Sequence, residues 1–279
     1  MQIVENISEL KPLVKSLKQG GKVGFVPTMG ALHQGHLSLV NESVEKDNST
    51  VVSIFVNPTQ FNNKNDLKSY PRNTEQDLAL LKPTGCDVVF IPSVEEMYPE
   101  EDTREFKLGL LDKVMEGLHR PGHFNEVAQV VTKLFDMVEP DRAYFGQKDF
   151  QQLAVIKKVV KDCAYNIEII PCATIRENDG LAMSSRNLLL EDKKREASPI
   201  IYKALSEIPD QIPTSTPNEI KEHVEDLFKG QGELELEYFD LVDSLTLESI
   251  KEWHNSESVT ACIAAFAGKV RLIDNLSLY

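Results

Sequence analysis

The sequence predicts an α/β fold, in which a parallel sheet covered on both faces is followed by a smaller α+β domain. In residues 1–175, short apolar runs alternate with helical patterns, as in chains that build parallel sheets. The run at residues 49–56 is β-branched and almost continuously apolar, which indicates a strand buried on both faces. From about residue 188 the order changes to helices followed by strands. We therefore predict domains at residues 1–175 and 176–279.

Hydrophobic periodicity gives the order of the elements. A first helix, capped by Asn6 or Ser8, ends before the glycines at 20–21. The predicted strands of the first domain are residues 22–26, 49–56, 87–91, 141–145 and 166–170, and its later helices are 74–81, 127–138 and 150–161. In the second domain, helices at 191–208, restarting at 198–199, and at 218–228 precede strands at 234–242 and within 258–273.

Composition limits the partners that the chain can bind. Its 279 residues carry 30 Lys and Arg against 44 Asp and Glu, a formal net charge of −14. Such a charge repels nucleic acid and anionic membranes, so we expect neither as a partner. An anionic substrate would therefore need a local positive pocket.

Cysteine usage and the N-terminal sequence indicate a cytoplasmic protein. Its four cysteines have neither metal-ligand nor disulfide-framework spacing, so we expect reduced thiols and no metal site built by the chain itself. The N-terminus lacks a basic segment followed by an apolar one, and no apolar run approaches the length of a membrane span.

The most informative stretch is residues 27–36, which connects a buried strand to a helix start. The first N–H groups of a helix lack partners within the helix, and its dipole adds positive charge, so a phosphate can bind there. Gly30 and Gly35 allow close approach of a ligand, and His33 and His36 can donate N–H groups to phosphate oxygens. An HxGH sequence also occurs by chance, and a histidine near a helix start is often a cap or a surface residue.

Amide side chains follow the second strand. Asn57 and Gln60 come where the carboxyl end of that strand would meet a ligand, although Asn-Pro-Thr also builds an ordinary turn. Further along, Arg120 and His123 precede an amphipathic helix, where they would be ligand contacts or ordinary helix-start residues. The apolar stripe of that helix, which includes Val127 and Val131, is interpreted as core.

Two later loops also suit an anion. In residues 146–152 a strand again meets a glycine and a helix start, with Asp149 and Gln152 in a capping-box pattern. Lys148 opposes the helix dipole there, and a bound phosphate would remove that conflict. The polar loop at 176–187 places two hydroxyl groups beside Arg186, although an ordinary loop would look similar.

With these residues in view, the chain resembles the pantothenate synthetase family, the pantoate:β-alanine ligases of the HIGH-type nucleotidyltransferase superfamily. The matching segments are residues 27–39, 55–61, 120–124, 145–153 and 179–187, in the family's order and spacing. Gln147 stands where many members have glutamate. The resemblance implies a Rossmann-like, doubly wound domain with a small C-terminal lid, usually as a homodimer.

The resemblance also implies a reaction: ATP, with Mg²⁺, activates (R)-pantoate as pantoyl adenylate, and β-alanine then gives pantothenate, AMP and pyrophosphate. The catalytic residues would be His33, His36, Lys148, Ser184 and Arg186, with the family's proton-donor assignment on His36. Gln60 and Gln152 match the pantoate contacts, and Gln60 also matches a β-alanine contact. The implied ATP contacts are Met29, Gly30, Ala31, Leu32, His33, Gln34, Gly35, His36, Gly146, Gln147, Lys148, Asp149, Ile175, Met183, Ser184, Ser185 and Arg186.

Three other functions share part of this pattern. An aminoacyl-tRNA synthetase would need a basic surface for tRNA, which this acidic chain lacks. A simple adenylyltransferase would not need the amides of Gln60 and Gln152. A module that only senses ATP could dispense with Lys148 or His36.

Overall fold

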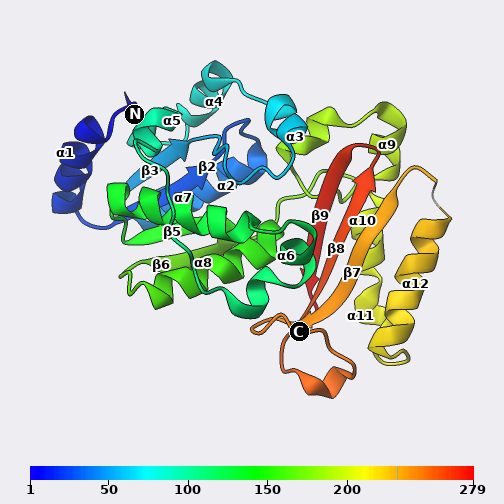
Figure 1. Ribbon diagram of the computed structural model, residues 1–279. Helices are drawn as coiled ribbons and strands as arrows, with labels where there is room; N and C mark the ends of the chain where they lie inside the picture. The colour runs from blue at the N-terminus through cyan, green and yellow to red at the C-terminus, as the bar shows by residue number, and fades with distance from the viewer. Residues whose placement is uncertain (231) are drawn as a thin grey trace.

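The computed structural model describes residues 1–230 and 232–279 and contains two sheets, which lie side by side in Figure 1. The first is a six-stranded parallel sheet in the order β1-β4-β3-β2-β5-β6, and the second is a three-stranded antiparallel sheet in the order β7-β8-β9. This architecture confirms the predicted fold class. The strands of the first sheet are β1 (Gln2–Val4), β2 (Val23–Thr28), β3 (Ser49–Ile54), β4 (Val88–Phe90), β5 (Arg142–Gly146) and β6 (Glu168–Cys172). Those of the second are β7 (Glu235–Asp243), β8 (Val259–Ala267) and β9 (Val270–Ser277).

The order of strands creates a switch point between β2 and β5. From β2 the chain builds β3 and β4 on one side, and it then returns to add β5 and β6 on the other. The strands β2 and β5 pair in parallel, with Gly24 opposite Arg142 and Phe25 opposite Ala143. Loops leaving two such neighbours diverge to opposite faces and leave a crevice at their carboxyl ends, where ligands bind in open α/β sheets.

Helices cover both faces of the parallel sheet. On one face α1 (Ile7–Leu17), α7 (His123–Val138) and α8 (Phe150–Asp162) pack in a cluster with Phe25 of β2, and on the other α2 (Gln34–Lys46) and α4 (Thr74–Leu81) pack in a cluster with Val26. Because successive side chains of a strand point to opposite faces, β2 must be apolar at nearly every position. Three short helices complete this part of the chain: α3 (Lys64–Ser69), α5 (Val94–Met97) and α6 (Met115–His119).

The antiparallel sheet is also covered on both faces. Helices α10 (Ile200–Ser206) and α12 (Pro217–Lys229) bury Leu205 and Val224 against Ile263 of β8. The opposite face contributes Cys262 to a cluster with Phe124 and Val159 of the first part of the chain. This double coverage explains why β8 is buried almost throughout its length. Two short helices, α9 (Asp192–Ala197) and α11 (Ile208–Gln211), flank α10.

The structure also differs from the predictions in places. The three-residue β1 was not predicted, because only Val4 of that strand is buried and the pattern is too short to detect. No helix was predicted in the acidic stretch at residues 95–101, but its first residues belong to α5, in which Met97 is buried. The capping box expected at Asp149 and Gln152 is wrong: a 3₁₀ turn (Gln147–Asp149) leads directly into α8, and Asp149 makes no side-chain cap.

Candidate active site

Two adjoining cavities lie at the carboxyl ends of the parallel strands. The smaller cavity has a volume of about 210 Å³ and is lined by loops that follow β2, β5 and β6. The larger cavity, of about 860 Å³, lies between the two sheets. Seven residues line both cavities: Met29, Gln60, Lys148, Asp149, Gln152, Ser184 and Arg186.

The three predicted anion-binding loops meet in the smaller cavity. His36 from the start of α2, Lys148 from the turn after β5 and Arg186 all line its walls. His33, Gly35, Gly146, Ile175, Met183 and Ser185 line the same space. The structure therefore brings together side chains that lie more than 150 residues apart in the sequence.

His33 and His36 cap the helix that carries them. The Nδ1 atom of His33 accepts a hydrogen bond from the backbone N–H of Gly35 (3.1 Å), and Nδ1 of His36 accepts one from the N–H of His33 (3.4 Å). Together these bonds form a capping box at the start of α2. Since Nδ1 accepts in both rings, each neutral ring carries its proton on Nε2. The structural and functional interpretations of this histidine pair are thus compatible.

Both rings are neutral near pH 7. Burial, aided by the charge of Lys148, lowers the pKa of His33 to about 4. Burial, with His33 and Lys148 nearby, lowers the pKa of His36 to about 3. Each histidine can therefore donate a hydrogen bond from Nε2–H to an anion without being a cation itself.

Asp77 shapes the loop in front of these histidines. Its buried carboxylate accepts hydrogen bonds from the N–H groups of Ala31 (3.0 Å) and Leu32 (2.7 Å), where Ala31 has a positive φ of 50°. These bonds hold the backbone in a turn that alanine rarely adopts. This role could not be predicted from the sequence, because Asp77 lies within an ordinary predicted helix.

Five of the residues implied as ATP contacts lie outside the walls of both cavities: Gly30, Ala31, Leu32, Gln34 and Gln147. The N–H groups of Ala31 and Leu32 already bond to Asp77, and the side chain of Leu32 belongs to a buried apolar cluster. Contacts of these five residues with ATP stay predictions.

The amide of Gln60 is held by its neighbours. Asn57, which is buried, donates from Nδ2 to Oε1 of Gln60 (3.2 Å), and Tyr98 donates to Oδ1 of Asn57 (2.9 Å). Nε2 of Gln60 in turn lies 3.2 Å from the sulfur of Met29. Asn57 therefore orients the amide of Gln60, and it also lines the smaller cavity itself.

Apolar side chains line the smaller cavity together with the two glutamines. Val127, Val130, Val131 and Leu134 of α7 line this space together with Phe55. The sequence identified the stripe on α7 as core, and four of its members are in fact both core and cavity wall. Periodicity cannot separate these two roles, because each needs an apolar side chain on the same helix face.

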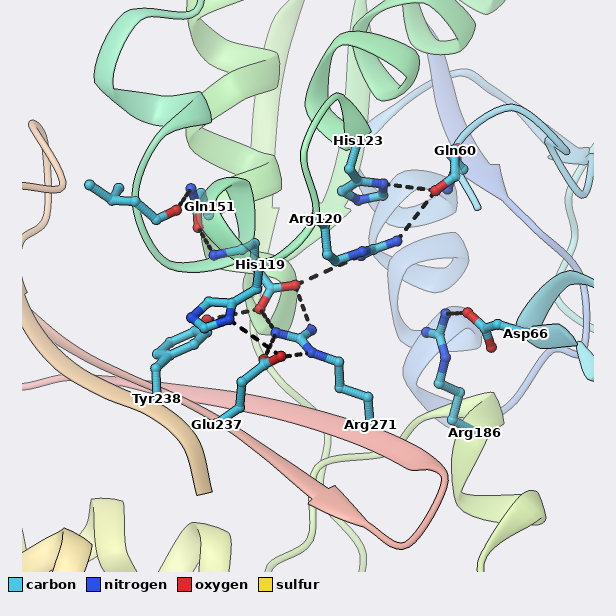
Figure 2. Close-up of polar contacts among 12 residues, drawn as sticks. Gln60, Asp66, His119, Arg120, His123, Gln151, Arg186, Glu237, Tyr238 and Arg271 are labelled. Carbon is cyan, nitrogen blue, oxygen red and sulfur yellow. Dashed lines mark hydrogen bonds and ion pairs between the residues drawn. The ribbon is translucent and has the colours of Figure 1, made fainter. Parts of the chain in front are cut away.

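Figure 2 shows a charged network where the two parts of the chain meet. The buried carboxylate of Glu116 accepts two hydrogen bonds from Arg271 of β9 (2.7 Å each) and one from Tyr238 of β7 (2.9 Å). Arg271 also pairs with Glu237. Burial raises the pKa of Glu116, but the hydrogen bonds and charge of Arg271 outweigh burial and hold that pKa below its usual value.

Two side chains of the loop at residues 120–123 contact the backbone carbonyl of Gln60. Nδ1–H of His123 donates to the carbonyl of Gln60 (3.0 Å), and Arg120 approaches the same oxygen at 3.4 Å. Burial, aided by Arg120, lowers the pKa of His123 to about 3. Arg186, on the other side of the larger cavity, forms an ion pair with Asp66 at 3.0 Å (Figure 2).

Two features are absent from the described residues. Within residues 1–230 and 232–279 there is no group of three or more His, Cys, Asp or Glu side chains that could hold a metal ion. Over the same part of the chain, none of the helices has both the length and the apolar character needed to cross a membrane.

A model of the family described as pantoate-beta-alanine ligase matches residues 2–277. The chain belongs to this family. It is 51% identical over 277 residues to the pantothenate synthetase of Bacteroides thetaiotaomicron, covering 99% of this chain and 98% of that protein. The corresponding protein of Porphyromonas gingivalis is 49% identical over 277 residues, which is 99% of each chain.

Solved structures of the family agree with the fold. The crystal structure of pantothenate synthetase from Thermus thermophilus has a TM-score of 0.93 and 40% identity, with 100% of both chains covered. The Francisella tularensis ligase, crystallised in complex with beta-gamma ATP and beta-alanine, has a TM-score of 0.82 and 37% identity and covers 99% of this chain and 97% of that one.

Proposed function

We propose that this chain condenses (R)-pantoate with β-alanine at the expense of ATP, through a pantoyl adenylate. A carboxylate oxygen of pantoate attacks the α-phosphorus of ATP, and the bond to the β-phosphate breaks to release pyrophosphate. The amine of β-alanine then attacks the acyl carbon, loses a proton, and displaces AMP as the amide forms. The observation that carries this proposal is the meeting of His36, Lys148 and Arg186 in one cavity beside Gln60 and Gln152.

In this proposal the smaller cavity binds ATP. Lys148, Ser184 and Arg186 would surround the phosphates together with the start of α2, and Gly146, Asp149, Ile175, Met183 and Ser185 would contact the nucleoside. His33 and His36 would stabilise the leaving pyrophosphate by hydrogen bonds from Nε2–H. Their low pKa values favour this role over transfer of a proton from His36 in the free enzyme.

Pantoate would lie among these amides and apolar side chains. Gln60 and Gln152 can bond its hydroxyl groups and carboxylate, because an amide offers both donors and an acceptor. The two methyl groups of pantoate suit the side chains of Val127, Val130 and Val131, which line the same cavity. Catalysis would then rest on positioning and electrostatics, without a protein nucleophile.

The C-terminal part, from about residue 176, would act as a lid on this site. One cluster of buried apolar residues lies within residues 181–272 and two others lie within residues 4–172, which supports the division at 175. A fourth cluster, which joins Phe124 and Val159 to Cys262, packs the two parts against each other. Closure would keep water from the adenylate, which hydrolysis would otherwise waste.

Three further expectations belong to this proposal. Mg²⁺ would arrive with ATP as part of the substrate, bound to phosphate oxygens. The chain would form a homodimer, as the family resemblance implies, and light scattering would measure its mass in solution. It would act in the cytoplasm, in keeping with cysteines that are all unpaired.

The decisive experiment supplies Mg²⁺, ATP and a panel of small hydroxy acids and measures pyrophosphate release. Release should require pantoate, and with β-alanine absent the adenylate should persist on the enzyme. Pyrophosphate release that is independent of the acid, or rapid appearance of free AMP and pantoate without β-alanine, would contradict the proposal.

A further inference from the structure

Arg120 is a charged residue of the site to which the proposed adenylation gives no role. It follows α6, and its guanidinium group lines the larger cavity beside Gln60, whose carbonyl oxygen lies 3.4 Å from Nη2. Gln60 lines both cavities, so Arg120 lies beside a residue that the two cavities share. The acyl adenylate would form at Gln60 in the smaller cavity.

The charge of Arg120 is poorly matched by its protein partners. The nearest carboxylate is Glu116, at 3.7 Å, and both oxygens of Glu116 already accept short hydrogen bonds from Arg271. By comparison, Arg176 makes a two-point pair with Asp274, at 2.5 and 3.1 Å. Figure 2 shows the two contacts of Arg120, to Gln60 and to Glu116. Because both contacts are long, at 3.4 and 3.7 Å, Arg120 keeps donors for a ligand.

The surroundings favour an anion at Arg120. Its side chain is only 24% exposed, and burial lowers its pKa, which means that an unpaired charge is costly there. Arg186 and Arg271 line the same cavity, and their partners Asp66 and Glu116 are occupied by those pairs. A carboxylate would supply the two-point partner that the guanidinium lacks.

We propose that Arg120 binds the carboxylate of β-alanine and so orients its amine toward the acyl adenylate at Gln60. The amine and the carboxylate of this substrate are two methylene groups apart. Holding the carboxylate in the larger cavity would therefore let the amine reach the wall that both cavities share. This inference rests on the proposed function and assigns the substrate's acidic end to a named residue.

The test separates the two half-reactions in Arg120→Ala and Arg120→Lys. Pantoate-dependent exchange of pyrophosphate into ATP reports adenylation, and single-turnover reaction of enzyme-bound adenylate with amine reports transfer. For Arg120→Ala, we expect the KM for β-alanine in transfer to rise about 10- to 100-fold, with exchange changed less than about threefold. Arg120→Lys should recover part of the loss, and Lys157→Ala, which removes an exposed charge on α8, should change neither step.

The preference of the enzyme for β-alanine over a second amine, β-alaninamide, distinguishes carboxylate binding by Arg120 from a merely structural role. β-Alaninamide has a neutral carboxamide in place of the carboxylate, so the native enzyme should prefer β-alanine strongly and Arg120→Ala should lose most of that preference. An equal fall with both amines, or an unchanged preference in Arg120→Ala and Arg120→Lys, would overturn the assignment. Absence of pantoate-dependent exchange in the native enzyme would instead refute the proposed function.

Discussion

The side-chain amide of Asn275 on β9 donates a hydrogen bond to the backbone carbonyl of Lys148, at 2.8 Å. The same nitrogen donates to the carbonyl of Gln147, at 2.9 Å. One residue of the C-terminal sheet thus holds the turn that carries Lys148, one of the cations that line the smaller cavity. The position of that sheet and the position of Lys148 are therefore coupled.

Replacing Asn275 by alanine should slow adenylation. Both hydrogen bonds to the turn would be lost, so Lys148 would be less well positioned for the phosphates, and small misplacements of a catalytic group are costly. We expect pantoate-dependent exchange of pyrophosphate to fall about tenfold, with the fold intact by circular dichroism. Asn218→Ala is the matched control, because Asn218 lies exposed on α12 and contacts only Glu222 through its side chain. Equal activity of the two variants would show that the contact does not matter.

Gly146 provides a test of where the nucleotide lies. Its backbone, with φ −69° and ψ 134°, suits any residue, and a Cβ added there would meet no protein atom within 4 Å. Neither strain nor packing therefore requires glycine. Gly146→Val should fold with nearly unchanged stability, but its methyl groups would occupy the smaller cavity and raise the KM for ATP about tenfold or more.

Gly20→Ala is the control for this variant. A Cβ at Gly20 also meets nothing within 4 Å, and this exposed residue lines neither cavity. Steady-state kinetics should give the native KM for ATP in Gly20→Ala. A native value in Gly146→Val as well would place the nucleotide elsewhere.

His36→Ala should lower the rate of adenylation about 100-fold or more, the usual cost of removing one preorganised donor at a developing charge. It should also destabilise the fold by about 1 kcal/mol, since His36 completes the cap of α2. Exchange kinetics and urea unfolding measure the two effects separately. His223→Ala removes an exposed histidine on α12 and should alter neither. Native exchange rates in His36→Ala would remove the proposed role.

The sequence predicted the parallel sheet and the meeting of three loops because both follow from local pattern. Apolar runs mark the strands, and the carboxyl ends of parallel strands share one edge. It could not predict the partners of those loops. Asp77 and Asn275 act through backbone atoms of residues that are distant in sequence, and hydrogen bonds to a backbone leave no pattern in either side chain.

The charged network of Glu116, Arg271, Glu237 and Tyr238 should contribute strongly to stability. In Glu116→Gln the partly buried guanidinium of Arg271 would lose its two-point partner, the buried carboxylate of Glu116, and breaking a buried pair typically costs about 3 kcal/mol or more. Urea unfolding should show this loss. The same substitution at Glu225, which is exposed on α12, should change the free energy of unfolding by less than about 0.5 kcal/mol. Similar values for the two variants would mean that Glu237 alone satisfies Arg271.

Stability should fall as the pH drops from 7.5 to 5, and His123 should account for part of the fall. Burial, with the charge of Arg120, lowers the pKa of His123 to about 3 in the folded chain, while the unfolded chain takes up a proton near pH 6.5. The unfolded state therefore binds more protons below pH 6.5, so the free energy of unfolding decreases as the pH falls. Glu116 adds little to this slope, because the stabilisation that its lowered pKa provides is lost only below about pH 4.5. Urea unfolding at several pH values should show that the free energy of unfolding depends less on pH in His123→Asn and as in the native protein in His223→Asn. An unchanged pH dependence in His123→Asn would mean that the ring takes up its proton as readily in the folded chain as in the unfolded chain.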